Sequence, residues 1–131
     1  MEQFPSPQDW FKSRMAYIRS LAVTSMVGYL VGLGDRHPHN LLLHKSSGEL
    51  VHIDLGVAFD QGRLLPTPEM VPFRLSRDLV HALGPLGLQA GFIPAAEAVL
   101  RELREGSDVI LTLLQVRKFI IFNHFSKSNF Y

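Results

Sequence analysis

Residues 34–54 of the chain have the sequence GDRHPHNLLLHKSSGELVHID. The second part of this stretch, from residue 41 onward, has the pattern of a hairpin. Two short apolar runs lie on either side of a polar turn that contains Gly48. Apolar runs of this length around a glycine-containing turn are typical of a β-hairpin, which we expect over residues 41–53. The polar residues just before and just after the hairpin would then meet at its open end.

The expected pairing places two oxygen-bearing side chains together. If Leu41 pairs with Ile53, then Asn40 and Asp54 lie opposite each other, within reach of one ion. An amide oxygen and a carboxylate are hard ligands, which suit Mg²⁺ better than Zn²⁺. We therefore predict that Asn40 and Asp54 are metal ligands.

The spacing of the polar residues indicates phosphoryl transfer. Asp35 precedes Asn40 by five positions, the offset of the protein-kinase catalytic loop, where the aspartate accepts the proton of the substrate hydroxyl and the asparagine holds a metal. Asp54 begins an Asp-Leu-Gly sequence, where that scheme has the Asp-Phe-Gly aspartate that bridges metal and nucleotide phosphates. His37 lies two residues after the expected base, where it can donate a hydrogen bond to the transferring phosphoryl group. We predict Asp35 and His37 as catalytic residues, and Asn40 and Asp54 as the residues that bind the metal and, through it, the nucleotide.

Helical patterns lie on both sides of this stretch. Ser6 and Asp9, around a proline, are typical of a helix start, and glycines end the helix that we expect over 7–32. Residues 54–77 carry glycines and prolines without a period and predict a long irregular segment, and residues 77–115 predict further helices. The expected fold class is α+β and mainly helical, with one short antiparallel hairpin. The predicted buried face of the first helix follows from steps of three or four residues: Phe11, Met15, Ile18, Ala22, Met26, Tyr29 and Leu33.

The composition excludes several classes of protein. The 131 residues have a formal net charge of +1 and no basic block, so the chain has no electrostatic footprint for nucleic acid. Cysteine is absent, which excludes disulfides and a thiolate nucleophile. Hydrophobic residues make up 47% of the chain, which excludes a disordered protein. The most apolar stretch, residues 21–33, is too short to span a bilayer. We expect one buried core, with no nucleic-acid and no membrane partner.

Several motifs resemble the phosphatidylinositol 3-kinase-related protein kinases: GLGDRH at 32–37, VHIDLGVAF at 51–59, and LPTPE and VPFRLSRD between 65 and 78. Within this family, residues 61–69 are most similar to the branch that responds to DNA breaks. The resemblance implies that residues 1–115 form the C-terminal lobe of a protein- or lipid-kinase-like fold. It places a catalytic loop at 33–40, the hairpin at 41–53 and an activation segment at 54–77, whereas residues 116–131 depart from the family pattern.

The resemblance also implies an activity and its residues. It identifies Asp35 as the catalytic aspartate, His37 as a phosphate-stabilising histidine, and Asn40 and Asp54 as ligands of Mg²⁺ or Mn²⁺ in a site that uses ATP. The family phosphorylates Ser or Thr followed by Gln in proteins of the DNA-damage response, and it works in the nucleus. These properties are expectations for this chain.

The charge of the expected activation segment indicates which class of molecule accepts the phosphoryl group. Residues 57–75 contain two basic residues, Arg63 and Arg74, and two acidic residues, Asp60 and Glu69. A lipid kinase needs cations in this segment to hold a phosphorylated headgroup. The near-neutral segment therefore favours a protein acceptor over a phosphoinositide.

Part of a kinase active site is not recognisable in the sequence. We find neither a glycine-rich phosphate loop nor a lysine-bearing strand before Asp35. In a kinase these two elements hold the phosphates of the nucleotide. We therefore expect the chain to act together with the N-terminal lobe and the C-terminal cap of a full-length kinase. We expect the isolated chain to be inactive.

Two other functions stay open. Asp35, His37, His39 and Asp54 could form the two-metal site of a phosphoesterase, although such enzymes need further ligands from later strands. Alternatively, the chain is a catalytically silent, truncated product.

Several residues also have purely structural interpretations. His39 and His44 are predicted to be solvated, and His52 is predicted to be a packed or edge histidine in the hairpin. Arg36 and Arg74 are predicted to be structural ion-pair partners, with direct contact to substrate as the alternative.

Overall fold

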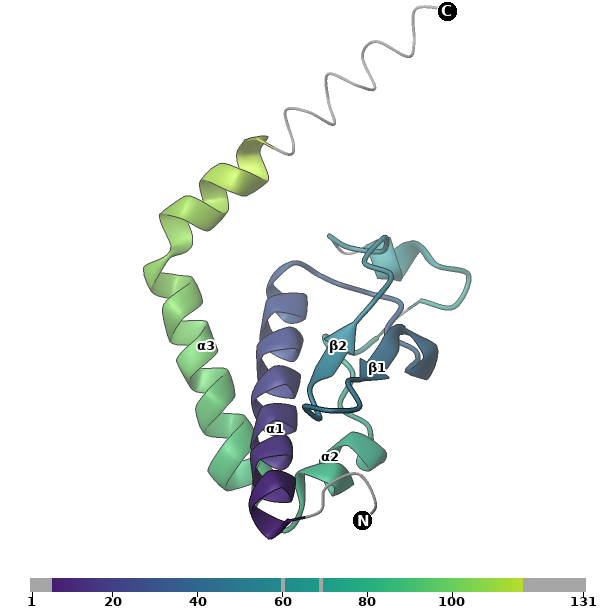
Figure 1. Ribbon diagram of the computed structural model, residues 1–131. Coiled ribbons are helices and arrows are strands. Elements are labelled where there is room, and N and C mark those ends of the chain that lie inside the picture. The colour runs from purple at the N-terminus through teal and green to yellow at the C-terminus, as the bar shows by residue number, and fades with distance from the viewer. Residues whose placement is uncertain (1–5, 60, 69, 117–131) are drawn as a thin grey trace, which may run out of the picture. The chain divides into compact units, whose positions relative to one another are not determined.

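The computed structural model describes residues 6–59, 61–68 and 70–116, and it confirms a mainly helical chain with an antiparallel hairpin (Figure 1). The chain divides into two compact units, Met1–Val99 and Leu100–Tyr131. The elements in chain order are α1 (Pro7–Leu30), the 3₁₀ turn η1 (Pro38–Asn40), β1 (Leu41–Leu43), β2 (Leu50–His52), the 3₁₀ turn η2 (Gln61–Leu64), α2 (Arg77–Leu83), the π-helical turn η3 (Leu88–Phe92) and α3 (Ile93–Glu105). A further apolar helix, Ser107–Val116, lies in the second unit.

Both ends of α1 are fixed by local hydrogen bonds. The Ser6 hydroxyl oxygen accepts a hydrogen bond from the Asp9 amide at 3.1 Å, as the sequence predicts for a helix start. At the other end, Gly32 has a φ of 57°. The Leu33 amide donates to the Gly28 carbonyl at 2.8 Å, and the Gly32 amide donates to the Tyr29 carbonyl at 3.3 Å. These bonds form a Schellman motif, which ends the helix and sets the direction in which the next loop leaves it.

The buried face of α1 differs in part from the prediction. Ile18, Ala22 and Met26 are buried as expected, but Phe11 and Tyr29 are 58% and 54% exposed. Apolar side chains occur on every side of this helix, so their spacing alone could not identify the face that packs against β2, α2 and η3. The core of the first unit consists of Tyr17, Ile18, Leu21, Ala22, Met26, Leu50, Ala58, Leu83, Phe92 and Ala96.

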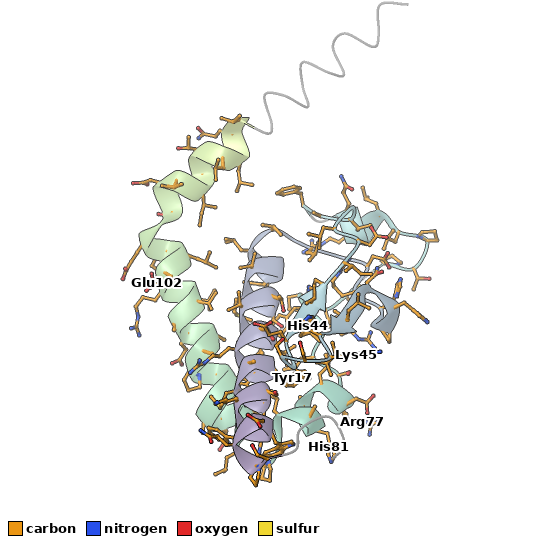
Figure 2. The ribbon with its side chains drawn as sticks, in the orientation of Figure 1. Tyr17, His44, Lys45, Arg77, His81 and Glu102 are labelled. Carbon is orange, nitrogen blue, oxygen red and sulfur yellow. The ribbon has the colours of Figure 1, made fainter. Side chains whose placement is uncertain are left out.

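Polar contacts tie the neighbouring elements to α1. The Tyr17 hydroxyl donates a hydrogen bond to the Leu79 carbonyl of α2 at 3.0 Å (Figure 2). Arg14 Nε donates to the Leu83 carbonyl, the last of α2, at 2.9 Å. On the hairpin side, the Leu50 amide of β2 donates to the Ser20 hydroxyl at 2.8 Å. The hairpin and α2 therefore both depend on α1 for their positions.

The register of the hairpin corrects the prediction by one residue. Leu41 pairs with His52, Leu42 with Val51 and Leu43 with Leu50, so the predicted Leu41–Ile53 pair is wrong. The reason is the turn: the His44 amide bonds to the Glu49 carbonyl at 2.8 Å, and the Gly48 amide bonds to the His44 carbonyl at 2.8 Å. Gly48 has a φ of 77°, a conformation that favours glycine.

From residue 76 on, helices begin or end at the serine and glycine residues that the sequence predicts. Ser76 precedes α2, Gly84 ends it with a φ of 78°, and Gly106 separates α3 from Ser107–Val116. Among the described residues, no single helix is long and apolar enough to cross a membrane, although α2 and Leu88–Glu105, as a bent pair, have sufficient length and apolar composition.

Candidate active site

The loop between α1 and β1 is held against the segment that follows β2. The Gly34 amide donates to the Val57 carbonyl at 2.8 Å, and the Phe59 amide donates to the Val31 carbonyl at 2.7 Å. Because Gly34 directly precedes Asp35 and Val57 lies three residues after Asp54, these bonds bring the two predicted functional segments side by side.

Asp35 and Asn40 contact each other across the loop. The Asn40 side chain, which is 6% exposed, donates from Nδ2 to the Asp35 carbonyl at 2.8 Å and to the Asp35 carboxylate at 3.4 Å. Asp35 has a φ of 57°, in the left-handed region that few residues other than glycine occupy. The use of Nδ2 leaves the amide oxygen of Asn40 as its ligating atom, which is the atom that a hard cation prefers.

His37 lies beside the Asp35 carboxylate. Its Nε2 is 3.8 Å from Asp35 Oδ1, and both side chains are partly exposed. The His39 amide donates to His37 Nδ1 at 3.2 Å, so Nδ1 is the acceptor and, in the neutral ring, Nε2 carries the proton. His37 lines the same pocket as Asp35, so an Nε2 that carries the proton can donate a hydrogen bond to an oxygen of a phosphoryl group bound there.

Asp54 joins this group through the backbone. With the corrected register, Asn40 lies opposite Ile53, whose amide donates to the Asn40 carbonyl at 3.0 Å. Asp54 is therefore the next residue beyond this pair. The prediction that Asp54 lies directly opposite Asn40 was wrong. Its side chain is exposed and its φ is 52°, again in the left-handed region.

Arg36 makes contacts that differ from those predicted. Among the described residues it forms no ion pair; its guanidinium donates instead to the carbonyls of Gly34 and Ile53, at 2.8 and 2.7 Å, and to the Asp54 carbonyl. The sequence interpretation as an ion-pair partner was therefore wrong. Arg74 lines the pocket that contains Asp35 and His37.

The predicted structural roles of the histidines agree with their positions. His39 is exposed, and exposed His44 accepts a hydrogen bond from the Ser47 amide within the hairpin turn. His52 is half-buried, and its Nδ1 is buried without a hydrogen-bond partner in the described part of the chain. Burial, and then the positive charge of Arg36, lower the pKa of His52.

Asn40 and Asp54 carry the oxygen atoms that a hard divalent cation prefers. Asn40 offers an amide oxygen and Asp54 a carboxylate, a hard donor set for Mg²⁺ or Mn²⁺. Over residues 6–59, 61–68 and 70–116, no group of three or more His, Asp or Glu side chains could hold a metal. Mg²⁺ commonly takes one or two protein ligands and fills its remaining positions with phosphate oxygens and water, whereas a two-metal phosphoesterase needs more protein ligands.

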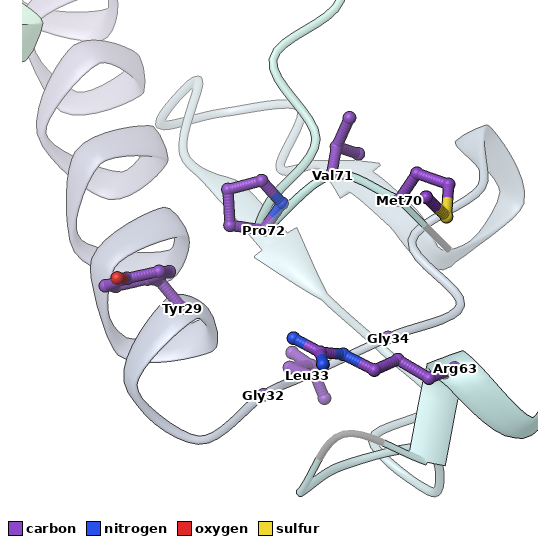
Figure 3. A pocket seen from close by; sticks show the side chains of 9 residues that line it. Tyr29, Gly32, Leu33, Gly34, Arg63, Met70, Val71 and Pro72 are labelled. Atoms are coloured by element: carbon purple, nitrogen blue, oxygen red, sulfur yellow. The ribbon is translucent and has the colours of Figure 1, made fainter. Parts of the chain in front are cut away.

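Two adjoining pockets lie where the loop between α1 and β1 faces the segment after β2. One pocket, of about 170 Å³, is lined by Asp35 and His37 and also by Val71, Phe73 and Arg74. The second pocket, of about 200 Å³, shares Leu33 and Val71 with the first. Figure 3 shows the second pocket, with Tyr29 of α1 on one side and Arg63 reaching across toward Leu33. Its lining residues are Tyr29, Gly32, Leu33, Gly34, Gly62, Arg63, Met70, Val71 and Pro72.

The chain matches a protein-family model over most of its length. Residues 1–121 match the family model described as phosphatidylinositol 3- and 4-kinase. The chain belongs to the phosphatidylinositol 3- and 4-kinase family.

Similar members of the phosphatidylinositol 3- and 4-kinase family are named protein kinases. The chain is 52% identical over 119 residues to the serine/threonine-protein kinase tel1 of Aspergillus oryzae, an alignment that covers 91% of this chain and 4% of that protein. It is 50% identical over 116 residues to the serine-protein kinase ATM of Sus scrofa, with 88% of this chain and 4% of that protein covered. The chain thus spans about 4% of the length of these relatives.

A solved structure of this family has the same fold. The structure titled "FAT and kinase domain of CtTel1" superimposes with a TM-score of 0.84 at 52% identity, over 87% of this chain and 8% of that one. The match confirms that the helix, hairpin and following segments are arranged as in a piece of a kinase domain.

Proposed function

We propose that this chain carries the catalytic loop and the metal-binding segment of a serine/threonine protein kinase. The observation that carries the proposal is the grouping of Asp35, His37 and Asn40. Asn40 donates hydrogen bonds to Asp35, His37 Nε2 lies 3.8 Å from the Asp35 carboxylate, and backbone bonds tie this loop to the segment of Asp54. These residue types in this arrangement match what phosphoryl transfer requires: a base, a donor to the phosphoryl oxygens and oxygen ligands for a cation. By the names of its relatives, the acceptor is a protein serine or threonine.

Each residue then has a defined role in the transfer. The acceptor hydroxyl loses its proton to the Asp35 carboxylate as its oxygen bonds to the γ-phosphorus of ATP, and the bond from phosphorus to the departing ADP oxygen breaks. His37 Nε2 donates a hydrogen bond to a γ-phosphoryl oxygen, where negative charge accumulates. Asn40 Oδ1 and the Asp54 carboxylate would hold Mg²⁺ or Mn²⁺. When bound, the cation neutralises charge on the β- and γ-phosphates.

The adjoining pockets give this proposal a place for the acceptor. The acceptor side chain would enter the pocket of Asp35 and His37, and the neighbouring residue of the same protein would reach the pocket of Tyr29, Arg63 and Met70. A partly polar pocket of about 200 Å³ has room for a glutamine side chain, which supports acceptors of the Ser-Gln and Thr-Gln type. We extend the proposal to substrates of the DNA-damage response and to the nucleus on the strength of the sequence resemblance.

The test needs these residues within a complete kinase. The matching segment of the Aspergillus oryzae tel1 kinase is replaced by residues 6–116 of this chain, and the unsubstituted chimaera is compared with its parent. We expect the chimaera to phosphorylate a Ser-Gln peptide and to transfer much less phosphate to the matched Ser-Ala peptide. Asp35→Asn and Asp54→Ala should each lower turnover by at least 100-fold, because they remove the base and a metal ligand.

The matched control is Asp78→Asn, an exposed aspartate in the first turn of α2, which should leave turnover within two-fold. Full turnover in the Asp35→Asn chimaera would contradict the assignment of the base. The 131-residue chain by itself should transfer no phosphate from ATP. If that chain instead hydrolyses a phosphate monoester with an added metal ion, the phosphoesterase interpretation replaces the kinase.

A further inference from the structure

Arg36 lies between the two aspartate segments of the candidate active site. Its side chain is 5% exposed, although arginine is a permanent cation. A buried charge is costly unless it is paired or fully hydrogen-bonded. Among the described residues no carboxylate forms an ion pair with Arg36, so backbone carbonyls satisfy it.

These carbonyls come from both sides of the site. Arg36 Nε donates to the Gly34 carbonyl at 2.8 Å, in the peptide that leads into Asp35. Nη1 donates to the Ile53 carbonyl at 2.7 Å, and Nη2 donates to the carbonyl of Asp54 itself. A guanidinium is planar and its donors have fixed directions, so three bonds from one guanidinium fix the carbonyls relative to one another.

The backbone at both aspartates needs such support. Asp35 and Asp54 have φ values of 57° and 52°, and residues other than glycine hold this conformation only where the surroundings over-determine it. Arg36 is bonded to the Gly34 carbonyl, in the peptide that precedes Asp35, and to the carbonyl of Asp54 itself, so the guanidinium holds the backbone from which both carboxylates project. The direction of each carboxylate in turn determines whether the base and the metal ligand face the same substrate.

We propose that Arg36 is a positioning residue that clamps the catalytic-loop aspartate and the metal-binding aspartate at a fixed separation. The inference rests on the proposed function for the roles of Asp35 and Asp54. Direct contact of Arg36 with substrate fits the geometry less well, because Nε and both terminal nitrogens are already engaged by carbonyls. A lysine keeps the charge but has no planar fork, so it cannot reproduce the three bonds.

The experiment compares Arg36→Lys with Arg14→Lys in the chimaeric kinase. Arg14 is a matched control, because its guanidinium also donates to a backbone carbonyl, that of Leu83, but at the opposite end of α1 from the catalytic loop. The first readout is kinetic: kcat, the KM for the peptide and the Mg²⁺ concentration at half-maximal rate. The second readout needs no turnover: hydrogen–deuterium exchange of residues 33–40 and 53–57 in the metal-free protein.

We expect Arg36→Lys to lower kcat by about 10- to 100-fold and to raise the half-maximal Mg²⁺ concentration, with the KM for the peptide within about two-fold. Both segments should exchange faster, whereas Arg14→Lys should change neither their exchange nor the Mg²⁺ requirement. The clamp is refuted if Arg36→Lys lowers only thermal stability, as a merely structural arginine would, or if one segment loosens and the other does not.

A further measurement on the unsubstituted kinase covers the case in which Arg36→Lys does not fold. If Arg36 joins the two segments, residues 33–40 and 53–57 open as one unit and respond together to denaturant; separate opening refutes the clamp. Loss of the proposed function looks different, because an inactive unsubstituted chimaera would still show the joint protection of the two segments.

Discussion

Replacing Gly48 by alanine should destabilise the fold by several kcal/mol. Gly48 has a φ of 77°, where a side chain costs about 1–2 kcal/mol. An added Cβ would also lie 2.8 Å from the Ser13 carbonyl oxygen and 3.0 Å from Ser13 Cβ. Because the carbonyl belongs to the backbone of α1, it cannot rotate away, and overpacking of this kind costs about 1–3 kcal/mol. The sum is about 2–5 kcal/mol.

The assay is urea unfolding of the 131-residue chain, followed by circular dichroism. The matched variant Gly28→Ala makes the same chemical change inside α1, where the new Cβ would meet only the Leu33 side chain, at 3.6 Å. That variant should be more stable by about 0.5–1 kcal/mol, because alanine is the better helix former. If Gly48→Ala unfolds within 0.5 kcal/mol of the unsubstituted chain, the hairpin turn does not pack on Ser13 as described.

Three further predictions concern two side chains of the core and the titration of His52. Leu21→Ala, at a residue that is 1% exposed, should lower the free energy of unfolding by about 2–5 kcal/mol, measured in the same urea assay. Tyr17→Phe removes the hydrogen bond to the Leu79 carbonyl and should cost about 0.5–1.5 kcal/mol; an unchanged unfolding midpoint would show that this bond contributes nothing. The lowered pKa of His52 makes stability depend on pH. Above about pH 6.5 the imidazole is neutral in both the folded and the unfolded state. As the pH falls from there toward the pKa of the folded state, the unfolded chain binds the proton first, so the free energy of unfolding decreases. The melting temperature should therefore fall over that range, and His52→Gln should flatten the profile; identical profiles would contradict the assignment.

Local signals predicted the elements well because each signal acts over a few residues. The Ser6 cap and the following proline identified the start of α1, and glycines marked the ends of α1 and α2. The hairpin was also recognisable, since its strands are apolar and its turn is polar. Such features depend on backbone conformation near one residue, which the residue type there largely determines.

The register of the hairpin was not predictable in the same way. The three leucines of β1 carry no alternation of apolar and polar residues that would select one register, so the turn makes the difference. In the structure Gly48 takes the left-handed conformation against α1, and His44 closes the turn with Glu49. The packing of the turn on Ser13, a contact distant in sequence, therefore selects the register.

In the candidate site, too, the residues were predictable from the sequence but their contacts with distant backbone groups were not. The residue spacing was sufficient to single out Asp35, Asn40 and Asp54, because their offsets carry the pattern of the kinase loop. The sequence predicted a structural role for Arg36 but the wrong kind of partner: a lone arginine in a loop suggests an ion pair, and nothing in the sequence indicates that its partners are three carbonyls. Backbone acceptors leave no trace in residue identity, so only the folded chain reveals them.

The hydrogen bond from the Leu50 amide to the Ser20 hydroxyl has a consequence for how this chain avoids aggregation. In a two-stranded sheet the outer edge of each strand presents unpaired amide and carbonyl groups, to which a strand of another molecule can add. On the outer edge of β2, the Leu50 amide is already bonded to a helical side chain, so a foreign strand would have to displace α1 to pair there. The helix that leads into the loop of Asp35 therefore also blocks one edge of the hairpin against the addition of a third strand.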